Sequence, residues 1–518
     1  MTNADYLKVG MASDLKDPKD RVVFRFLEIL PGLLSWGTLA ALFLLSWLKP
    51  FFVAVFIIAF TIYWFFRTVY FSFHLRSSYQ RMKVNEETDW LEKLNGLNVN
   101  DFSLPINGWK DVYHLVFLPI CKEPLEIARE AFSALIKTDY PKDKMIVVLA
   151  AEESNRANLE LIVSKIQQEF GGSFFKLLAT WHPAGLPGEI PGHGSNDAWA
   201  AKEVRKMAID PLQIPYENII VSSFDIDTCV FPKYFSCLTH YYLTTENQIR
   251  VSFQPIPLYI NNIWQAPFFS RIFSFTSTFW QMMCQERPEK LLTFSSHSMP
   301  FRALVDAGFK QVNAVSDDSR IFWQCFLNYN GDYKVIPIFY PVSMDANVSK
   351  SFWRTIKNIY KQQRRWAYGA ADIAFVFFGF LNNKKISRLK KFLKVIDLLE
   401  GHWSWATASI MIFFLGWLPI AIGVPEFSQA LIAYSLPKTI SRILTFSMVG
   451  LILSAYFAIL LLPPKPSGYG RFKYLFLAVE WLLLPLIMIF FSSLPALEAQ
   501  TRLMMGKYLG FWPTEKTR

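Results

Sequence analysis

The sequence predicts an α/β domain inserted between two groups of membrane helices. Three observations lead to this prediction: few charged residues, long apolar runs toward both ends of the chain, and alternating strands and helices in the middle. Of the 518 residues, 18% are charged and 52% are hydrophobic, whereas about 25% of an average soluble domain is charged. This composition excludes a disordered chain, a collagen and a disulfide-stapled miniprotein, and it disfavours a purely cytosolic enzyme.

Five apolar runs are candidates for membrane spans. A helix needs about 20 mostly apolar residues to cross a hydrocarbon core of about 30 Å. The runs cover residues 29–48, 51–66, 403–424, 443–462 and 474–494. Glu480 lies inside the last run, and a charge at membrane depth is expected to face protein or water.

Basic residues around these runs set the expected orientation. Lysines and arginines flank the first two runs on the side of the N-terminus and of the middle region, whereas Lys49 alone lies between the runs. By the positive-inside rule, the N-terminus and the middle region are cytosolic. We therefore expect a multi-pass protein of the plasma membrane. The basic segment 384–394 fits either a helix on the anionic inner leaflet or a solvated helix face.

These patterns divide the chain into seven parts. We expect a cytosolic N-terminal segment (1–28), two transmembrane helices (29–70), a linker (71–104), a cytosolic α/β domain with interfacial helices (105–385), an amphipathic interface helix (386–402), three or four transmembrane helices (403–497) and a C-terminal tail (498–518). The five cysteines form no Cys-x-x-Cys pair, so they are expected to be free thiols in a reducing compartment.

The middle region alternates strands and helices. Strands are predicted at 113–120, 145–151, 174–181 and 218–224, with helices at 125–137 and 155–170. Nearly continuous apolar strands between amphipathic helices indicate a parallel sheet that is covered on both faces. Ligands bind beyond the carboxyl ends of such strands. The sequence has no Gly-x-Gly-x-x-Gly after the first strand and no P-loop motif, so dinucleotide-binding and P-loop interpretations fail.

Three polar motifs follow these strands. Asp225 and Asp227 end a strand, and two carboxylates at this spacing can face one divalent cation; a simple turn is the alternative. Asp317 and Asp318 form a second acidic loop that can supply a general base or cap a helix. Gln362, Arg365 and Trp366 share one helix face, which suits a phosphate and a sugar. A juxtamembrane anchor would explain Arg365 and Trp366 but not Gln362.

Together these motifs resemble the membrane-embedded family-2 glycosyltransferases, which include the cellulose, chitin and hyaluronan synthases. Asp-x-Asp, a later acidic loop and Gln-x-x-Arg-Trp occur in that order between membrane helices. The resemblance covers nearly the whole chain, including the closing residues 511–516. It implies a GT-A (Rossmann-like) glycosyltransferase domain inserted between transmembrane helices.

The resemblance also implies roles for particular residues. Asp225 and Asp227 would hold the cation on the nucleotide diphosphate, and Asp318 would be the general base beside Asp317. Contacts to the nucleotide sugar would come from Pro119, Glu123, Glu153, His193, Asn196 and Asp225. Contacts to the acceptor or the diphosphate would come from His297, Gln362, Arg365 and Trp366.

The sequence departs from the family pattern at three of these places. Glu153 lies in Ala-Ala-Glu-Glu where relatives have an aspartate, and a neutral His193 stands where they often have a lysine. The segment around His297 lacks the customary glycine of the acceptor loop.

The implied activity is that of an inverting hexosyltransferase with Mg²⁺ or Mn²⁺. It would move a sugar from a nucleotide diphosphate sugar, expected to be UDP-linked, to a growing β-linked polysaccharide, coupled to export. Single-sugar transfer to a lipid acceptor to give a glycolipid is the alternative. A transporter with a regulatory domain would leave the acidic motifs unexplained. Membrane lipids are expected partners, whereas nucleic acid is not, because the basic residues mostly flank the apolar runs.

Overall fold

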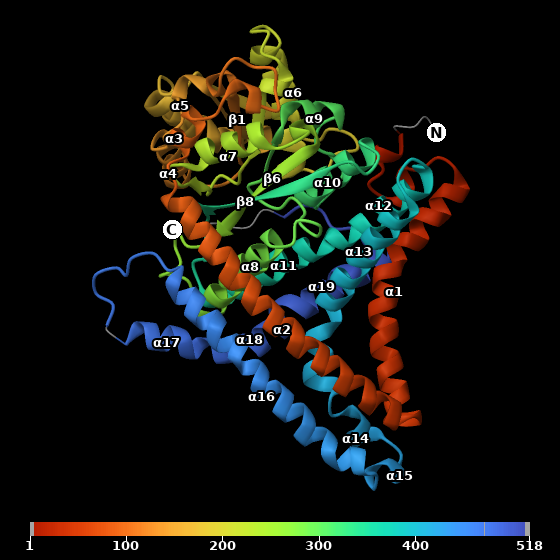
Figure 1. Cartoon of the computed structure of the whole chain (residues 1–518). Helices are drawn as coiled ribbons and strands as arrows, with labels where there is room; N and C mark the ends of the chain where they lie inside the picture. Colours follow the sequence, from red (N-terminus) through yellow and green to blue (C-terminus); the bar gives the residue numbers. More distant parts are fainter. Residues whose placement is uncertain (1–4, 471, 513–518) are drawn as a thin grey trace.

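The chain folds into an α/β domain from which long apolar helices extend (Figure 1). The computed structural model describes residues 5–470 and 472–512. In Figure 1 the sheet lies at the top, and α1, α2 and α16 extend away from it below. The predicted fold class, an α/β domain inserted between helices that can cross a membrane, is confirmed.

An eight-stranded sheet forms the centre of the α/β domain. Its spatial order is β3-β2-β1-β4-β7-β6-β8-β5. The strands are β1 (Tyr113–Ile120), β2 (Met145–Glu152), β3 (Lys176–His182), β4 (Ile219–Ser223), β5 (Cys229–Val230), β6 (Val251–Leu258), β7 (Ser298–Pro300) and β8 (Lys334–Ser343). The four predicted strands are therefore present, with bounds that differ by at most two residues.

The sheet is mixed, so the predicted parallel arrangement is present in only part of it. Strands β1 to β4 run parallel, but β7 pairs antiparallel with β4 and β6. Strand β7 has three residues, which is too short for a periodic pattern in the sequence. Ser222 of β4 lies opposite Ser298 of β7, and their buried hydroxyls are 2.7 Å apart.

Helices cover both faces of the sheet. One core lies between the sheet and α3 (Trp90–Asn95), α4 (Leu125–Ile136), α5 (Arg156–Phe170) and α7 (Tyr234–Thr244). The other involves α6 (His193–Val204), α9 (Phe301–Asp306), α10 (Asp317–Asn328) and α12 (Ala371–Asn382). Strands β1, β2 and β4 are buried almost throughout, as their apolar sequences predict.

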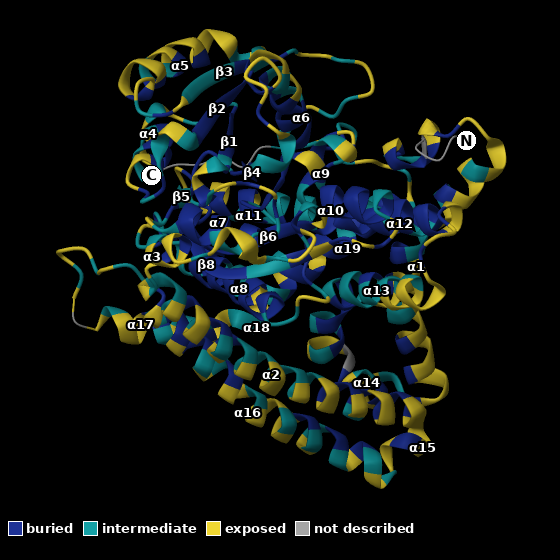
Figure 2. Cartoon of the chain, turned by 45° about the horizontal axis from the view of Figure 1, so that its top comes forward, coloured by how far each residue is buried: buried dark blue, intermediate teal, exposed yellow. Residues whose placement is uncertain are grey.

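Within the described residues, four helical segments are long and apolar enough to cross a membrane. They are α1 (Pro18–Leu48), α2 (Pro50–Glu87), α16 (Leu431–Leu460) and Lys473–Met504, the last made of α17 (Lys473–Glu480), α18 (Leu484–Met488), α19 (Leu494–Met504) and short turns between them. Figure 2 shows many exposed residues along α2 and α16. Large apolar side chains such as Phe52 and Ile452 are among them, as a lipid-facing surface requires.

Three predicted boundaries differ from the structure. Residues 71–87 of the predicted linker continue α2, and α1 begins at Pro18 rather than at residue 29. Residues 403–424 form the end of α13 (Arg388–Ile410), a π-helical turn and α14 (Leu418–Ile422) instead of one helix. The break follows Gly416, and a second glycine, Gly423, ends α14.

Several helices lie between the sheet and the long helices. They include α8 (Phe268–Gln285), α11 (Phe352–Ala367) and α13 (Figure 1). In α13, Lys390 donates to the carbonyl of Gly331, and Lys391 donates to the carbonyl of Asn383. The outward side of this helix is apolar, because Leu389, Phe392 and Leu393 are exposed. The short α15 (Pro425–Ser428) precedes α16.

Glu480 is paired inside the helical region, as its position in an apolar run predicts. Its carboxylate accepts hydrogen bonds from the guanidinium of Arg271 on α8. A charge in the apolar region thus faces a partner in the protein.

Candidate active site

One cavity of about 1410 Å³ extends from the carboxyl ends of the central strands to the long helices. It brings together every predicted site residue except Glu153 and His297. The predicted residues that line it are Pro119, Glu123, His193, Asn196, Asp225, Asp227, Asp317, Asp318, Gln362, Arg365 and Trp366. These residues come from distant parts of the chain, so the fold assembles them at one place.

Asp225 and Asp227 follow β4, at the centre of the sheet. The Asp225 carboxylate accepts a hydrogen bond of 2.7 Å from the Ser295 hydroxyl, and its other oxygen is 3.4 Å from Nε2 of His193. The buried Asp227 carboxylate accepts a hydrogen bond of 3.1 Å from the backbone N–H of Asp345. The pair is thus held from the 295 loop and from the end of β8.

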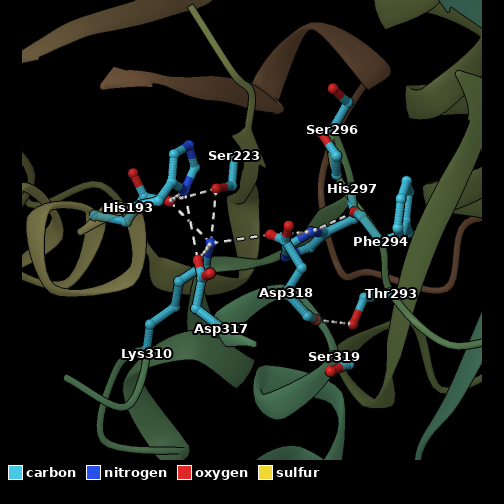
Figure 3. Close-up of polar contacts among 12 residues, drawn as sticks. His193, Ser223, Thr293, Phe294, Ser296, His297, Lys310, Asp317, Asp318 and Ser319 are labelled. Carbon is cyan, nitrogen blue, oxygen red and sulfur yellow. Dashed lines mark hydrogen bonds and ion pairs between the residues drawn. The ribbon is translucent and has the colours of Figure 1, made fainter. Parts of the chain in front are cut away.

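Asp317 and Asp318 begin α10 and have different surroundings. Lys310 Nζ lies 3.2 Å from an Asp317 oxygen and 3.5 Å from an Asp318 oxygen (Figure 3). Asp317 is buried, whereas the Asp318 side chain is 30% exposed. Lys310 also lies 2.9 Å from Asp197 and donates to the Ser223 hydroxyl. A buried ammonium therefore joins the start of α10 to α6 and to the end of β4.

The two neighbouring aspartates differ in acidity. Burial opposes ionisation of Asp317, but the charges of Lys310 and His193 lower its pKa below the ordinary value. Burial and the adjacent Asp317 carboxylate raise the pKa of Asp318 to about 6. Asp317 is therefore a permanent anion, while Asp318 can accept and release a proton near neutral pH.

His193 lies among three carboxylates, which favour the protonated ring over the neutral ring that the sequence suggested. It begins α6, and Nδ1 lies 3.4 Å from Asp317 and 3.6 Å from Asp197. Burial favours the neutral ring, but Asp197, Asp317 and Asp225 raise its pKa to about 10. The protonated ring adds positive charge to this group of carboxylates beside that of Lys310.

The Gln-x-x-Arg-Trp face of α11 forms another wall of the cavity. Gln362 accepts a hydrogen bond of 3.3 Å from the Asn347 amide. The Arg365 guanidinium lies 4.6 Å from the centre of the Phe511 ring. Trp366 contacts the aromatic rings of Phe294, Phe273 and Tyr259, with centroid distances of 5.5, 6.2 and 6.4 Å. A cation and a broad aromatic surface therefore adjoin the acidic group.

Glu153 and His297 are the two predicted residues that do not line the cavity. Glu153 forms an ion pair with Arg156 on the surface, while the preceding residue, Glu152, lines the cavity at the end of β2. His297 is buried, with Nδ1 3.6 Å from an Asp318 oxygen. Burial and Lys310 lower its pKa to about 3, so its ring is neutral.

Sequence reasoning missed Lys310, Asp197 and Phe511 as parts of the site. Asp197 lies four residues after His193, a spacing that could have indicated a shared helix face. Nothing near Lys310 in the sequence marks it. Phe511 belongs to the C-terminal segment noted in the sequence, of which residues 513–516 lie outside the described part. A Cβ atom on Gly192 would lie 2.5 Å from Phe511 Cγ, so the close contact requires glycine.

Among the described residues, one group of side chains has the spacing of a metal site. Ligand atoms of His193, Asp317 and Asp318 lie within 4.8 Å of one another. Oxygen and imidazole ligands of this kind suit Mn²⁺, and carboxylates suit Mg²⁺. The group differs from the predicted pair Asp225 and Asp227, although His193 touches Asp225.

Comparisons with known proteins give weak matches of structure only. No family model and no curated protein matches the sequence. Similar solved structures include a mannosyltransferase from Pyrobaculum calidifontis in complex with GDP-Man and Mn²⁺, with 13% identity, a TM-score of 0.41, and 78% of this chain and 99% of that chain covered. Another is S. aureus TarS 1–349 in complex with UDP-GlcNAc, with 13% identity, a TM-score of 0.37, and 65% and 90% covered. Such low scores assign no activity to this chain.

Proposed function

We propose that this chain is an inverting, membrane-embedded glycosyltransferase of the GT-A type, similar to family 2. It transfers a hexose from a nucleotide diphosphate sugar, expected to be UDP-linked, to an acceptor hydroxyl. One observation carries the proposal: a single cavity contains acidic side chains, cationic side chains, an aromatic surface and a connection to the apolar helices. A transporter with a regulatory domain would not need the first three together.

The chemistry follows from the charges in the cavity. Asp318, as carboxylate, takes the proton from the acceptor hydroxyl while that oxygen attacks the anomeric carbon. The bond from that carbon to the diphosphate breaks, and the electron pair leaves with the diphosphate. Arg365 and protonated His193 provide positive charge for this leaving group, where negative charge develops.

A divalent cation, Mg²⁺ or Mn²⁺, fits the predicted pair Asp225 and Asp227 better than the group His193, Asp317 and Asp318. Lys310 already neutralises the second group at 3.2 and 3.5 Å. The Asp225 carboxylate accepts a hydrogen bond from the Ser295 hydroxyl and lies 3.4 Å from Nε2 of His193. A cation bound there would offset the charge of the phosphate oxygens.

The acceptor that the cavity suits is a growing β-linked polysaccharide. Beyond Trp366, the cavity is lined by hydroxyl groups and tryptophans of the helices, among them Ser404, Trp405, Ser447 and Trp481. Such side chains can hydrogen-bond and stack on sugar rings. We propose that the polymer leaves through this path, with the α/β domain in the cytosol and the helices in the plasma membrane.

A second candidate is single transfer to a membrane lipid. It is favoured by the aliphatic side chains in the same part of the cavity, including Ile412, Leu444 and Leu451. The hydrocarbon chains of a lipid acceptor would pack against these apolar side chains.

Product analysis tests both candidates. Purified protein in lipid nanodiscs is given a panel of labelled nucleotide sugars with Mg²⁺ or Mn²⁺, and the products are sized. A ladder of polymers supports the polysaccharide product, and one chloroform-soluble product supports lipid transfer. Absence of any sugar transfer or nucleotide release across the panel would contradict the glycosyltransferase proposal.

A further inference from the structure

Tyr259 is a buried tyrosine in the cavity wall whose hydroxyl has no partner. It directly follows β6 and is 8% exposed. Among the buried tyrosines of residues 5–470 and 472–512, it alone has an unpaired hydroxyl. Tyr140, for comparison, donates to the Val112 carbonyl, and the Tyr234 hydroxyl bonds with Ser298.

Burying a hydroxyl without a hydrogen-bond partner lowers the stability of the folded protein. Removing it from water without a new hydrogen bond costs about 1–3 kcal/mol in proteins. Most buried polar groups in native proteins have a hydrogen-bond partner, and a bound ligand, ion or water is one way in which the others gain one. Because Tyr259 lines the cavity, a bound molecule can supply the missing partner.

The surroundings of Tyr259 indicate which kind of partner it has. Burial and the carboxylates of Asp225 and Asp227 raise its pKa well above the ordinary value, so the hydroxyl keeps its proton and can donate. Asp318 has a smaller influence, and Arg365 acts in the opposite direction. The ring packs beside Trp366 of α11. Tyr259 thus lies beside the Gln-x-x-Arg-Trp face, in the wall of the cavity that Asp225 and Asp227 also line.

We propose that the Tyr259 hydroxyl donates a hydrogen bond to the distal phosphate of a bound nucleoside diphosphate. The inference rests on the proposed glycosyltransferase function and adds a contact to the leaving group. A cation at Asp225 and Asp227 and the guanidinium of Arg365 would attract the same phosphate. The distal phosphate gains negative charge as the sugar leaves, so the bond strengthens during the reaction.

The test is Tyr259→Phe, which removes one oxygen and keeps the ring. Binding of UDP, GDP and ADP to wild type with Mn²⁺ is measured by calorimetry, and the tightest one is compared with its monophosphate. Tyr259→Phe should bind the diphosphate about 10- to 100-fold more weakly, as expected for a hydrogen bond to a charged group. Its affinity for the monophosphate should equal that of wild type, because the distal phosphate is absent.

Two further measurements separate this contact from a structural role. Without nucleotide, Tyr259→Phe should be as thermally stable as wild type or more so, because it removes an unsatisfied group. Its kcat should fall more than its KM rises. Tyr140→Phe is the matched control: it breaks a bond to the Val112 carbonyl, so it should lower Tm and leave diphosphate affinity unchanged.

The outcomes distinguish the two proposals. If wild type binds none of the diphosphates, both the glycosyltransferase function and the Tyr259 contact are overturned. If wild type prefers the diphosphate but Tyr259→Phe binds it equally well, the Tyr259 contact alone is overturned. Equal weakening for diphosphate and monophosphate, or a lower Tm without nucleotide, also overturns it.

Discussion

Asp317 and Asp318 are neighbours in sequence, yet only one of them is suited to act as a base. Lys310 and His193 hold Asp317 as a buried anion. Asp318 turns toward the cavity and keeps 30% of its side chain exposed. Burial raises the pKa of both carboxyl groups, but only Asp317 has two cations close enough to lower it below the ordinary value.

Asp318→Asn should reduce kcat by about 10²–10⁴-fold, the usual contribution of a general base. The amide keeps the shape of the side chain but cannot take the proton, so nucleotide affinity should change less than twofold. In wild type, kcat/KM should rise with pH through about 6, because the carboxylate is the active form. Asp306→Asn on α9 is a control that should retain activity. Normal turnover by Asp318→Asn would show that another group is the base.

Lys310 acts as an internal counter-ion, so its removal should expose a negative site. Lys310→Met leaves Asp197 and Asp317 without their ammonium partner, at a cost of about 3–5 kcal/mol in stability. Added Mn²⁺ should restore part of the lost Tm, because the group His193, Asp317 and Asp318 then carries uncompensated negative charge that can bind a cation. Thermal unfolding with and without Mn²⁺ measures both effects. The control is Lys202→Met, at an exposed lysine of α6, which should change neither the Tm nor its response to Mn²⁺. Identical Mn²⁺ responses in Lys310→Met and wild type would refute the counter-ion role.

At this scale the sequence predicted charge-bearing motifs better than their partners. Asp225, Asp318 and Arg365 stand in recognisable patterns, and all line the cavity. Lys310 and Tyr259 have no local pattern, because their roles depend on residues distant in the chain. Glu153 illustrates the remaining error: adjacent residues of a strand end point in different directions, and Glu152 is the one that faces the cavity.

At the scale of elements, α12 holds the start of α10 in place. The buried Asp372 carboxylate of α12 accepts hydrogen bonds from Arg320, Ser316 and Ser319. These residues surround Asp317 and Asp318 in sequence. The helix that follows the Gln-x-x-Arg-Trp motif therefore positions the proposed base, and the two motifs depend on each other.

Asp372→Asn should lower both stability and activity. Arg320 is 2% exposed and would lose its charged partner, which costs about 3–5 kcal/mol for a buried pair. The segment that carries Asp318 would also become less ordered, so kcat should be lower even at temperatures at which the variant is folded. Circular dichroism melting measures the loss of stability. Product formation at about 20 °C below the Tm of each variant measures the loss of activity while the protein is folded. The control is Glu217→Gln, which breaks an exposed ion pair with Arg302 at 3.5 Å and should lower the free energy of unfolding by less than about 1 kcal/mol. Equal losses of stability and activity in both variants would contradict the role of Asp372.

Element prediction succeeded where one local pattern decides the structure. Strands β1 and β2 are buried throughout nearly all of their length, so their apolar runs identify them. Residues 403–424 are apolar enough for a span, but glycines and a π-helical turn divide the segment. Strand β7 exists because β4 and β6 offer edges to it, which no window of the sequence can show.

For the whole molecule, the decisive feature is that the polar site and the apolar helices share a cavity. The polar part is formed by the α/β domain and α11, and the remainder by α2, α8, α13, α16 and α18. The polar motifs predicted the first part, and the apolar runs with their flanking charges predicted the second. Their connection depends on packing, including the approach of α2 to α16, where a Cβ on Gly450 would lie 2.2 Å from Thr68 Cγ2.

A bulky side chain in the helical part of the cavity should separate sugar transfer from nucleotide hydrolysis. Ser447 of α16 lines the cavity, and Ser447→Trp would fill the proposed path of the acceptor. We expect product formation to fall at least about tenfold, while diphosphate release by transfer to water stays within twofold, because Asp225 and Arg365 are untouched. Val449, two residues away, is 58% exposed and lies outside the cavity lining, so Val449→Trp should preserve both rates. If Ser447→Trp also makes full-length product at the wild-type rate, the acceptor takes another route out of the α/β domain.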